Sequence, residues 1–336
     1  MKIENLAQNI AQLLKNAQYH VLQTVNQTMV LTYFEIGKMV VEEEQAGKQR
    51  ATYGKQLLKA LSAKLTQEFG KGFSEDNLSN MRKFYLVYHA QISETPFRKS
   101  TNTNTPFKLS WSHYLKLMRI TDNQERAFYE IEAYQNNWSL RELQRQYNAG
   151  LYARLALSKN QEELHTLATK GQIVEQAKDL IKDPYILEFL NLPERQHYSE
   201  NDLEQELINK LEHFLLELGK GFTYVARQHR ISFEEKHFRI DLVFYNRILK
   251  CFVLIDLKIG ELKHQDIGQM QMYVNYFDRA VKLEEENKTI GIIFCQDKSD
   301  AIVKYTLPEN NTQIFASKYL TILPSQEDFK HLLSQK

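Results

Sequence analysis

The chain has few of the residues that build disulfide, zinc or membrane scaffolds. It has only two cysteines in 336 residues, Cys251 and Cys295, and both lie in apolar segments. We therefore expect buried thiols in a reducing compartment, and neither a disulfide nor a cysteine-rich zinc site. No apolar run is long enough to span a membrane, and the first residues lack the basic-then-apolar order of a signal peptide. These absences predict a soluble, cytoplasmic protein that has no membrane partner.

The sequence also lacks an excess of either positive or negative charge. The sequence has 43 Lys and Arg and 42 Asp and Glu, so its formal net charge of +1 says nothing about nucleic acid. Residues 1–165 hold 21 basic and 16 acidic side chains, and the remainder holds 22 and 26. The basic half could favour phosphates and the acidic half could hold cations. An asymmetry of this size is equally compatible with no functional meaning.

The spacing of apolar residues separates a helical part of the chain from a part that has strands. In residues 1–165 they recur at every third or fourth position, which predicts helices throughout. Residues 166–200 resemble a helical connector. Residues 201–336 predict a helix to residue 218, three strands within 222–257, a helix over 264–280 and a strand over 289–296. The fold class is therefore a two-domain α+β chain, with an all-α first domain and an α/β second domain that has a mixed central sheet.

Two of the predicted strands carry acidic residues in apolar surroundings. Residues 249–258 (LKCFVLIDLK) are an apolar run that ends in Asp256 and Lys258. A charge at the end of a core strand is costly unless it is paired or bound to a metal. A hairpin would bring Asp241, from the preceding strand, beside Asp256. Two carboxylates and the Leu257 carbonyl suit Mg²⁺ or Mn²⁺, and Lys258 would orient a water or stabilise charge on a phosphate.

The helix before the sheet offers a further carboxylate. At helical spacing, Glu204 falls within the apolar stripe of residues 201–218, whereas Glu217 falls outside it. A buried glutamate needs a partner, and the predicted metal site is one candidate. The alternative is a structural ion pair with Arg227 or Arg239.

The helix after the sheet carries Gln269 and Tyr273, four residues apart and therefore on one face. Both side chains can contact a phosphate or Lys258. A glutamine and a tyrosine at this spacing are also typical of a surface residue followed by a core aromatic residue. Their position shortly after Lys258 favours the functional interpretation.

These residues together resemble the PD-(D/E)xK nuclease superfamily. The order is Asp241, then Asp256 to Lys258, then the Gln-x-x-x-Tyr element of residues 269–273 that RecB-like members carry. Residues 238–278 resemble the YhcG family of PD-(D/E)xK nuclease-domain proteins, and stretches of the first half are similar to that family's helical domain. The resemblance implies a restriction-endonuclease-like core that cleaves phosphodiesters with Mg²⁺.

The resemblance also implies residue roles. Catalytic roles fall on Asp241, Asp256, Lys258, Glu204, Gln269 and Tyr273. Metal ligation falls on Asp241, Asp256 and Glu204, to which the residues themselves add the Leu257 carbonyl. The sequence departs from the family pattern at two positions. Ile240 replaces the proline of the superfamily name, and Asp256 stands where glutamate is frequent, which shortens this ligand by one methylene.

Candidate nucleic-acid contacts lie in both domains. Basic residues crowd the predicted hairpin and could follow a phosphate backbone, although a charged, solvated sheet edge explains them equally well. In the first domain, the turn at residues 70–72 joins two helices in a helix-turn-helix-like arrangement, which is also a common purely structural element. The candidates are Arg227, Arg230, Arg239, Asn77, Arg82 and Lys83.

The leading hypothesis is a metal-dependent nuclease whose helical domain binds DNA or a partner, in defence or DNA processing. The alternatives are a nucleic-acid-binding or assembly module without activity, and a helix-turn-helix regulator with an accessory domain. The presence of all the acidic and basic positions favours the enzyme. The sequence does not distinguish DNA from RNA, or endonuclease from exonuclease. A homodimer would be convenient, because one site per chain would otherwise have to cut both strands of a duplex.

Overall fold

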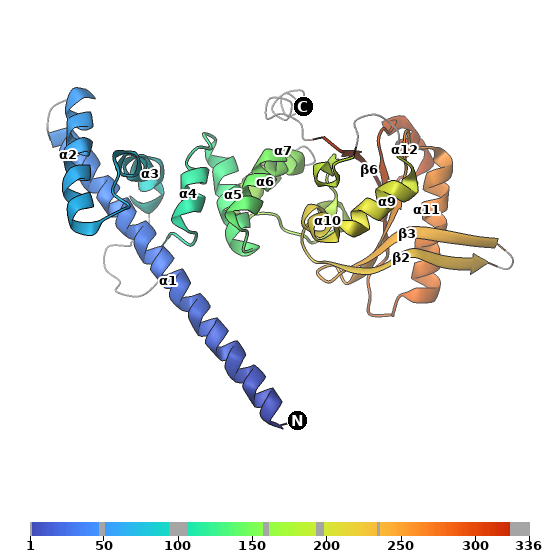
Figure 1. Cartoon of the computed structure of the whole chain (residues 1–336). Helices are drawn as coiled ribbons and strands as arrows, with labels where there is room; N and C mark the ends of the chain where they lie inside the picture. Colours follow the sequence, from blue (N-terminus) through green and yellow to red (C-terminus); the bar gives the residue numbers. More distant parts are fainter. Residues whose placement is uncertain are drawn as a thin grey trace. The chain divides into compact units, whose positions relative to one another are not determined.

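The computed structural model describes residues 2–46, 51–93, 106–156, 161–192, 198–233 and 236–322. Packing contacts divide the chain into two compact units, residues 1–144 and residues 145–336. Among the described residues, strands occur only in the second unit (Figure 1). None of the helices in the described ranges is both long and apolar enough to cross a membrane.

The first unit is helical, as its apolar spacing predicts. Its described helices are α1 (Lys2–Ala46), α2 (Ala51–Phe69), α3 (Glu75–Ser93), α4 (Trp111–Leu117) and α5 (Asn123–Gln135), while α6 (Leu140–Asn148) crosses into the second unit. A Cβ at Gly37 of α1 would lie 2.0 Å from the Met81 carbonyl oxygen of α3, so only glycine allows this close crossing. Phe84 of α3 is fully buried against the rings of Phe107, Trp111 and Tyr114.

The second unit is built on a six-stranded mixed sheet in the order β1-β6-β5-β4-β3-β2. The strands are β1 (Tyr185–Ile186), β2 (Phe222–Phe233), β3 (Lys236–Asn246), β4 (Cys251–Leu257), β5 (Ile290–Cys295) and β6 (Ile314–Leu320). β2, β3 and β4 pair antiparallel, whereas β4, β5, β6 and β1 pair parallel. This topology confirms the predicted mixed sheet.

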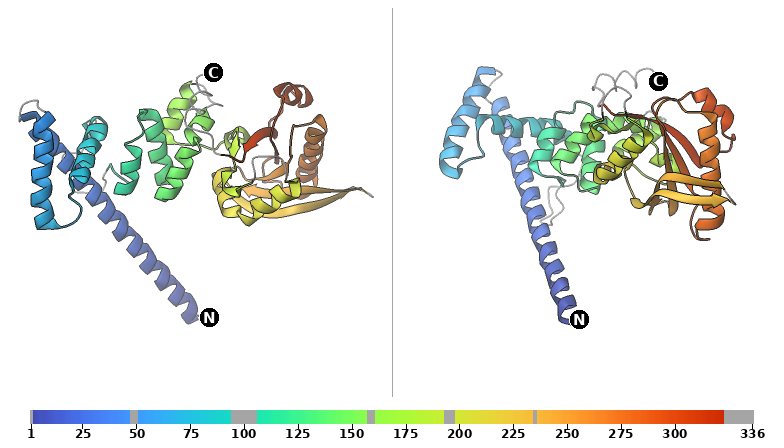
Figure 2. Two further views of the ribbon diagram at one scale, coloured as in Figure 1. Left: turned by 45° about the horizontal axis from the view of Figure 1, so that its top comes forward. Right: turned by 45° about the vertical axis from the view of Figure 1, so that its right-hand side comes forward.

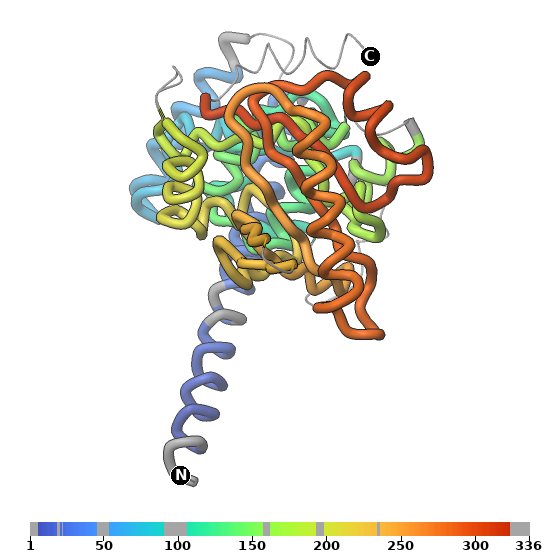
Figure 3. Tube along the Cα trace, turned by 90° about the vertical axis from the view of Figure 1, so that its right-hand side faces the viewer, coloured from blue at the N-terminus to red at the C-terminus, as the bar shows by residue number. Residues whose placement is uncertain are grey.

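Helices cover both faces of this sheet. The described helices of the unit are α7 (Leu151–Ala156), α8 (Gln161–Lys170), α9 (Glu200–Asn209), α10 (Leu211–Leu218), α11 (His264–Tyr276) and α12 (Asp300–Thr306), with the short turns η2 (Ala177–Leu180), η3 (Glu188–Leu190) and η4 (Phe277–Val281). Val253 and Ile255 of β4 pack in the core under α9 and α10, whereas Leu254 packs in the core under α11. Figure 3 shows the unit from the side of α11. β4 is therefore a central strand that is buried on both faces, as its apolar run predicts.

The predicted helix over residues 201–218 is interrupted at Lys210. This residue leaves helical geometry, with φ −119° and ψ 34°, and its ammonium donates to the carbonyls of Phe189 and Leu190 at 2.9 and 3.0 Å. After the interruption, the side chains of α10 point in directions that differ from those of one continuous helix. Glu217, which a continuous helix would place outside the apolar stripe, is fully buried, so that prediction was wrong.

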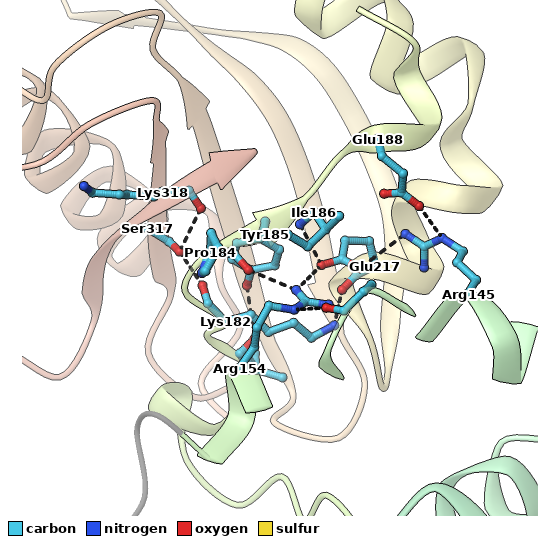
Figure 4. A network of polar contacts seen from close by, with 12 residues as sticks. Arg145, Arg154, Lys182, Pro184, Tyr185, Ile186, Glu188, Glu217, Ser317 and Lys318 are labelled. Carbon is cyan, nitrogen blue, oxygen red and sulfur yellow. Dashed lines mark hydrogen bonds and ion pairs between the residues drawn. The ribbon is translucent and has the colours of Figure 1, made fainter. Parts of the chain in front are cut away.

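Glu217 is the centre of a buried ion network (Figure 4). One carboxylate oxygen accepts from Arg154 at 2.6 Å and from the backbone N–H of Ile186 at 3.1 Å. Arg145 lies 3.4 Å from the other oxygen, and the Lys182 ammonium donates to the Glu217 carbonyl. The Ile186 N–H is available because β1 forms an edge of the sheet.

These contacts place the division of the chain before the residue 165 expected from the sequence. Arg145 and Arg154 bind a carboxylate of the sheet unit, and residues 166–200, expected to be a connector, contribute β1 to the sheet. The physical reason is that the two arginines bury their charge against an acidic group more than sixty residues away. No local sequence pattern records such a partner.

Candidate functional site

Asp241 lies where β3 and β4 separate. The register of the two strands ends with Leu242 opposite Ile255. Beyond this point, Asp241 Oδ2 accepts a hydrogen bond from the Leu257 backbone N–H at 2.8 Å. The side chain thus takes the place of a backbone acceptor, which fixes the carboxylate beside the end of β4.

Asp256 and Lys258 lie at the end of β4. The Lys258 ammonium is 2.8 Å from Asp256 Oδ2, and the two side chains are 17% and 3% exposed. The Lys258 backbone N–H donates to the Phe294 carbonyl of β5 at 2.8 Å, which holds the residue against the sheet after β4 has ended. The structure therefore brings the predicted acidic pair and the predicted lysine together.

A third carboxylate, Glu200 at the start of α9, reaches the same group. Its Oε2 lies 3.7 Å from the Lys258 ammonium, and its Oε1 accepts from the Ile259 N–H at 3.3 Å. The sequence interpretation missed this residue. Its spacing was the available signal, because Glu200 precedes Glu204 by four residues and so shares its helix face.

The charges in this site are not balanced. Burial, followed by the nearby charge of Asp241, raises the pKa of Asp256 to about 7, even though Lys258 acts to lower it. Burial also raises the pKa of Asp241. Burial acts to lower the pKa of Lys258, but Asp256, Glu200 and Asp241 outweigh it and the pKa is raised. One ammonium thus faces three carboxylates, a surplus of negative charge that a cation would offset.

Glu204 lies next to this group through a bridging glutamine. Its carboxylate is 2% exposed and accepts from Arg227 Nε at 3.0 Å. The Gln228 side-chain amide donates both to Glu204 and to Asp241, the latter at 3.1 Å. Burial raises the pKa of Glu204. Glu204 therefore forms the ion pair with Arg227 that was the structural alternative, and it lies one side chain away from Asp241.

Gln228 is the second residue that the sequence interpretation missed. Its backbone has φ +48°, a left-handed conformation that is unfavourable for a non-glycine residue and typical of functional sites. The sequence gives no signal for this conformation. The amide of Gln228 bonds to both the buried Glu204 carboxylate and the half-buried Asp241 carboxylate.

Gln269 and Tyr273 tie α11 to β3. The Gln269 amide donates to the Tyr273 hydroxyl, which in turn donates to the Arg239 carbonyl at 2.9 Å. Tyr273 is fully buried. This pair holds the backbone at Arg239, two residues before Asp241, and so helps to position the Asp241 carboxylate.

The donor set fits a hard divalent cation. Asp241, Asp256 and the Leu257 carbonyl offer oxygen ligands, and burial together with the nearby Asp241 charge raises the pKa of Asp256 despite its ion pair with Lys258. Within the described ranges, no three His, Cys, Asp or Glu side chains converge as a metal cluster. Mg²⁺ suits such a set, because it commonly uses one or two carboxylates and keeps several waters.

The basic residues of the hairpin have different environments. Arg227 is bonded to Glu204 and to Gln205, each at 3.0 Å. Arg230 and Arg239 are exposed and lie directly opposite each other in the β2–β3 register. Like charges in this arrangement destabilise a strand pair.

The candidate contacts in the first unit also have different environments. Asn77 donates to the Gly72 carbonyl in the turn between α2 and α3, and it accepts from Trp111 Nε1 at 3.1 Å. Arg82 forms an ion pair with Glu44. Lys83 is exposed. Asn77 and Arg82 therefore have structural roles, and Lys83 presents its charge at the surface.

Known families match both halves of this chain. Residues 178–334 match the YhcG PDDEXK nuclease domain, and residues 9–154 match the DUF1016 N-terminal domain. The chain is 36% identical over 348 residues to the protein named "Putative nuclease YhcG" of Escherichia coli (strain K12), which covers 96% of this chain and 92% of that protein. The chain belongs to the YhcG family. Its PDDEXK nuclease domain contains the acidic site, and PDDEXK nucleases generally use divalent metal ions.

Two solved structures share weaker similarity with this YhcG-family chain. A repair endonuclease from Pyrococcus abyssi gives a TM-score of 0.26 at 16% identity, with 38% of this chain and 49% of that chain covered. An EndoMS–dsDNA complex gives a TM-score of 0.27 at 14% identity, with 40% and 50% covered. The chain thus spans about half of each, and similarity this low does not bear on function.

Proposed function

We propose that this YhcG-family chain is a metal-dependent nuclease that hydrolyses phosphodiester bonds, with DNA as its substrate. One observation carries the proposal: Asp241, Asp256 and Lys258 meet at the point where β3 and β4 separate. The family membership supports it, because the matched domain is a nuclease domain and the relative is named a putative nuclease. A role in DNA processing or defence is part of the proposal. Both cysteines are free and buried, which supports a reducing compartment such as the cytoplasm.

In the proposed reaction, Asp241, Asp256 and the Leu257 carbonyl would hold the metal ion. A bound Mg²⁺ or Mn²⁺ supplies polarisation of a phosphate oxygen and acidification of a water. Lys258 has a raised pKa, so it stays protonated at neutral pH and acts as a cation rather than as a base. Its ammonium orients the water and stabilises the charge that develops on the phosphate.

Other residues keep this arrangement in place. Gln228 holds Glu204 at a fixed distance from Asp241. Its hydrogen bond to Glu204 must break if Glu204 is to turn toward a metal ion. Gln269 and Tyr273 anchor β3 beside Asp241 through the Arg239 carbonyl. These residues position the ligands.

The substrate backbone contacts Arg230 and Arg239. A phosphate between the two opposed arginines would remove their mutual repulsion. Arg239 precedes Asp241 by two residues, so their backbones are about 7 Å apart along the strand. In the helical unit, Lys83 is the exposed candidate for a DNA contact.

Cleavage assays test the proposal. The wild type is incubated with linear, circular, branched and single-stranded DNA and with matched RNA, in Mg²⁺ and in EDTA. We expect cleavage of DNA in Mg²⁺ only, and a loss of about a thousandfold or more in Asp256→Asn and Lys258→Ala. Glu212→Gln, at an exposed glutamate, is the matched control and should cleave normally. Full Mg²⁺-dependent cleavage by Asp256→Asn would refute the assignment.

A second candidate is a nucleic-acid-binding or assembly module without activity. One observation favours this module: Glu204 is ion-paired with Arg227. Of the three predicted carboxylate ligands, only Asp241 and Asp256 are then left to bind a metal ion. The two candidates differ in metal binding. Equal Mn²⁺ binding by the wild type and Asp241→Ala in calorimetry would favour the module.

A further inference from the structure

The first part of α1 carries an apolar surface that its own unit does not cover. α1 has 45 residues, and its N-terminal part stands clear of α2 and α3 (Figures 1 and 2). Seven large apolar side chains there are between 39% and 69% exposed. They form what we term the α1 stripe: Leu6, Ile10, Leu13, Leu14, Val21, Val25 and Met29.

The α1 stripe lies on a different face of the helix from the residues that pack in the first unit. At about 100° per residue, the positions from Leu6 to Val25 fall within an arc about 120° wide. The buried positions Val30, Phe34 and Val41 centre on nearly the opposite direction. The face that packs against α3 therefore cannot extend to cover the α1 stripe.

We infer that the α1 stripe is the interface with a second copy of this chain. Each side chain of this size presents about 100 Å² of apolar surface. Two copies that pair through the six residues from Leu6 to Val25 would bury about 1,200 Å² in all, at the lower end of the range of about 1,200–2,000 Å² found in stable interfaces. Burial of this stripe also supplies the packing that a long projecting helix needs in water.

The composition around the stripe favours an identical partner over a charged one. Between residues 2 and 29 the formal charges are Lys2, Glu4 and Lys15, and the other polar residues are mostly Gln, Asn and Thr. A lipid surface or a nucleic acid would be recognised by a basic face, which this helix lacks. Two copies of a neutral apolar stripe can pack against each other without burying an unpaired charge.

The sizes of the side chains favour antiparallel pairing. From Leu6 to Val25, the larger side chains lie in the first half of the stripe and the smaller valines lie in the second half, where Ala17 is also exposed. An antiparallel pair centred between Leu14 and Ala17 places a large residue against a small one at three positions: Leu6 against Val25, Ile10 against Val21, and Leu14 against Ala17. The helix dipoles then oppose each other, which is also favourable.

Mass measurements on the full-length chain test the interface, whether or not the protein is a nuclease. We expect the wild type to have the mass of two 39.7 kDa chains by light scattering and sedimentation. Ile10→Glu should raise the dissociation constant at least about 100-fold and give monomers. Gln8→Glu adds the same charge on the opposite face and should leave the dimer intact. Circular dichroism checks that each variant is folded.

Two results would overturn the inference. A wild type that stays monomeric at all concentrations would mean that another partner, or another part of the chain, covers the stripe. An Ile10→Glu variant as dimeric as the wild type would mean that the dimer forms elsewhere.

Cysteine cross-linking tests the orientation. Oxidation should convert an Ile10→Cys, Val21→Cys double variant to a covalent dimer, because these positions face each other across the pair. Ile10→Cys alone should give little product, because the two copies of residue 10 lie about 16 Å apart along an antiparallel pair. The native cysteines are buried, so they do not compete. Equal cross-linking by Ile10→Cys alone would overturn the antiparallel arrangement.

Discussion

The second unit contains two buried carboxylate clusters that differ in charge balance. At Glu217, burial acts to raise the pKa, but Arg154, Lys182 and Arg145 outweigh it and lower the pKa to about 2. At Asp256, burial and Asp241 raise the pKa to about 7, and Lys258 compensates only in part. Both carboxylates are almost fully shielded from solvent. Burial alone therefore does not distinguish a structural acid from a functional one.

The number of cations around each carboxylate makes the distinction. Three basic groups satisfy Glu217, so its network needs no ligand and ties α6, α7 and β1 to α10 (Figure 4). At the other cluster, the Lys258 ammonium compensates the charges of both Asp256 and Asp241, and Glu200 adds further negative charge. Buried acids that lack compensation are typical of sites that bind a cation or carry out chemistry.

The largest effect is expected at the balanced cluster. Glu217→Gln leaves the fully buried Arg154 without its counterion, and it should lower the free energy of unfolding by about 3–5 kcal/mol. Denaturant unfolding followed by circular dichroism measures the change. Glu212→Gln, on the same helix but exposed, should change the stability by less than about 0.5 kcal/mol. Equal stabilities for the two variants would show that the network is not structural.

The unbalanced cluster should respond in the opposite direction. Asp256→Asn removes a carboxylate that is repelled by Asp241, so at pH 8 and without metal it should raise the free energy of unfolding by about 1–3 kcal/mol. The same variant should lose cleavage. A stability loss as large as that of Glu217→Gln would place Asp256 among the structural acids.

The two clusters should also give opposite pH dependences. The pKa of Glu217 is lowered from 4.5 to about 2, so its stabilising contribution is complete above about pH 4.5 and is lost as the pH falls toward 2. The pKa of Asp256 is raised from 3.8 to about 7, so the folded state loses stability as the pH rises from about 4 to about 7. The free energy of unfolding is measured from pH 2 to 8. Its fall at acidic pH should disappear in Glu217→Gln, and its fall between about pH 4 and 7 should disappear in Asp256→Asn. Unchanged profiles in both would contradict these assignments.

The smallest effect is expected at Gln228. Gln228→Ala removes the amide that joins Glu204 and Asp241, and it should cost about 1 kcal/mol in unfolding free energy. Gln228→Gly loses the same amide but relaxes a backbone that has φ +48°, so it should be more stable than the alanine variant by up to about 1 kcal/mol. Thermal unfolding of the two variants compares them directly. A glycine variant no more stable than alanine would show that the backbone is unstrained.

The sequence predicted the features that depend on local pattern. Apolar runs located β3 and β4, and a hairpin between them was enough to bring Asp241 to Asp256 and Lys258. Gln269 and Tyr273 were placed on one helix face, and they are bonded to each other there. These features follow from periods of two and 3.6 residues, which a single sequence records.

The remaining features depend on distant partners or on local backbone geometry. Glu217 follows an interruption of the helix at Lys210, and its charge is balanced by arginines more than sixty residues away. The positive φ of Gln228 has no sequence signal. The sequence left open whether Glu204 pairs with Arg227, with Arg239 or with a metal ion, and the structure pairs it with Arg227. Charge balance inside a site therefore has to be read from the structure.

Calorimetric titration with Ca²⁺ tests most directly the claim that the unbalanced acidic cluster is a cation site. Ca²⁺ is used because it should bind without turnover, and it can be applied at pH 8 to wild type, Asp256→Asn and the control Glu212→Gln. We predict binding to wild type and the control, and a loss of at least about tenfold in affinity in Asp256→Asn. Equal Ca²⁺ affinity in all three proteins would contradict the account.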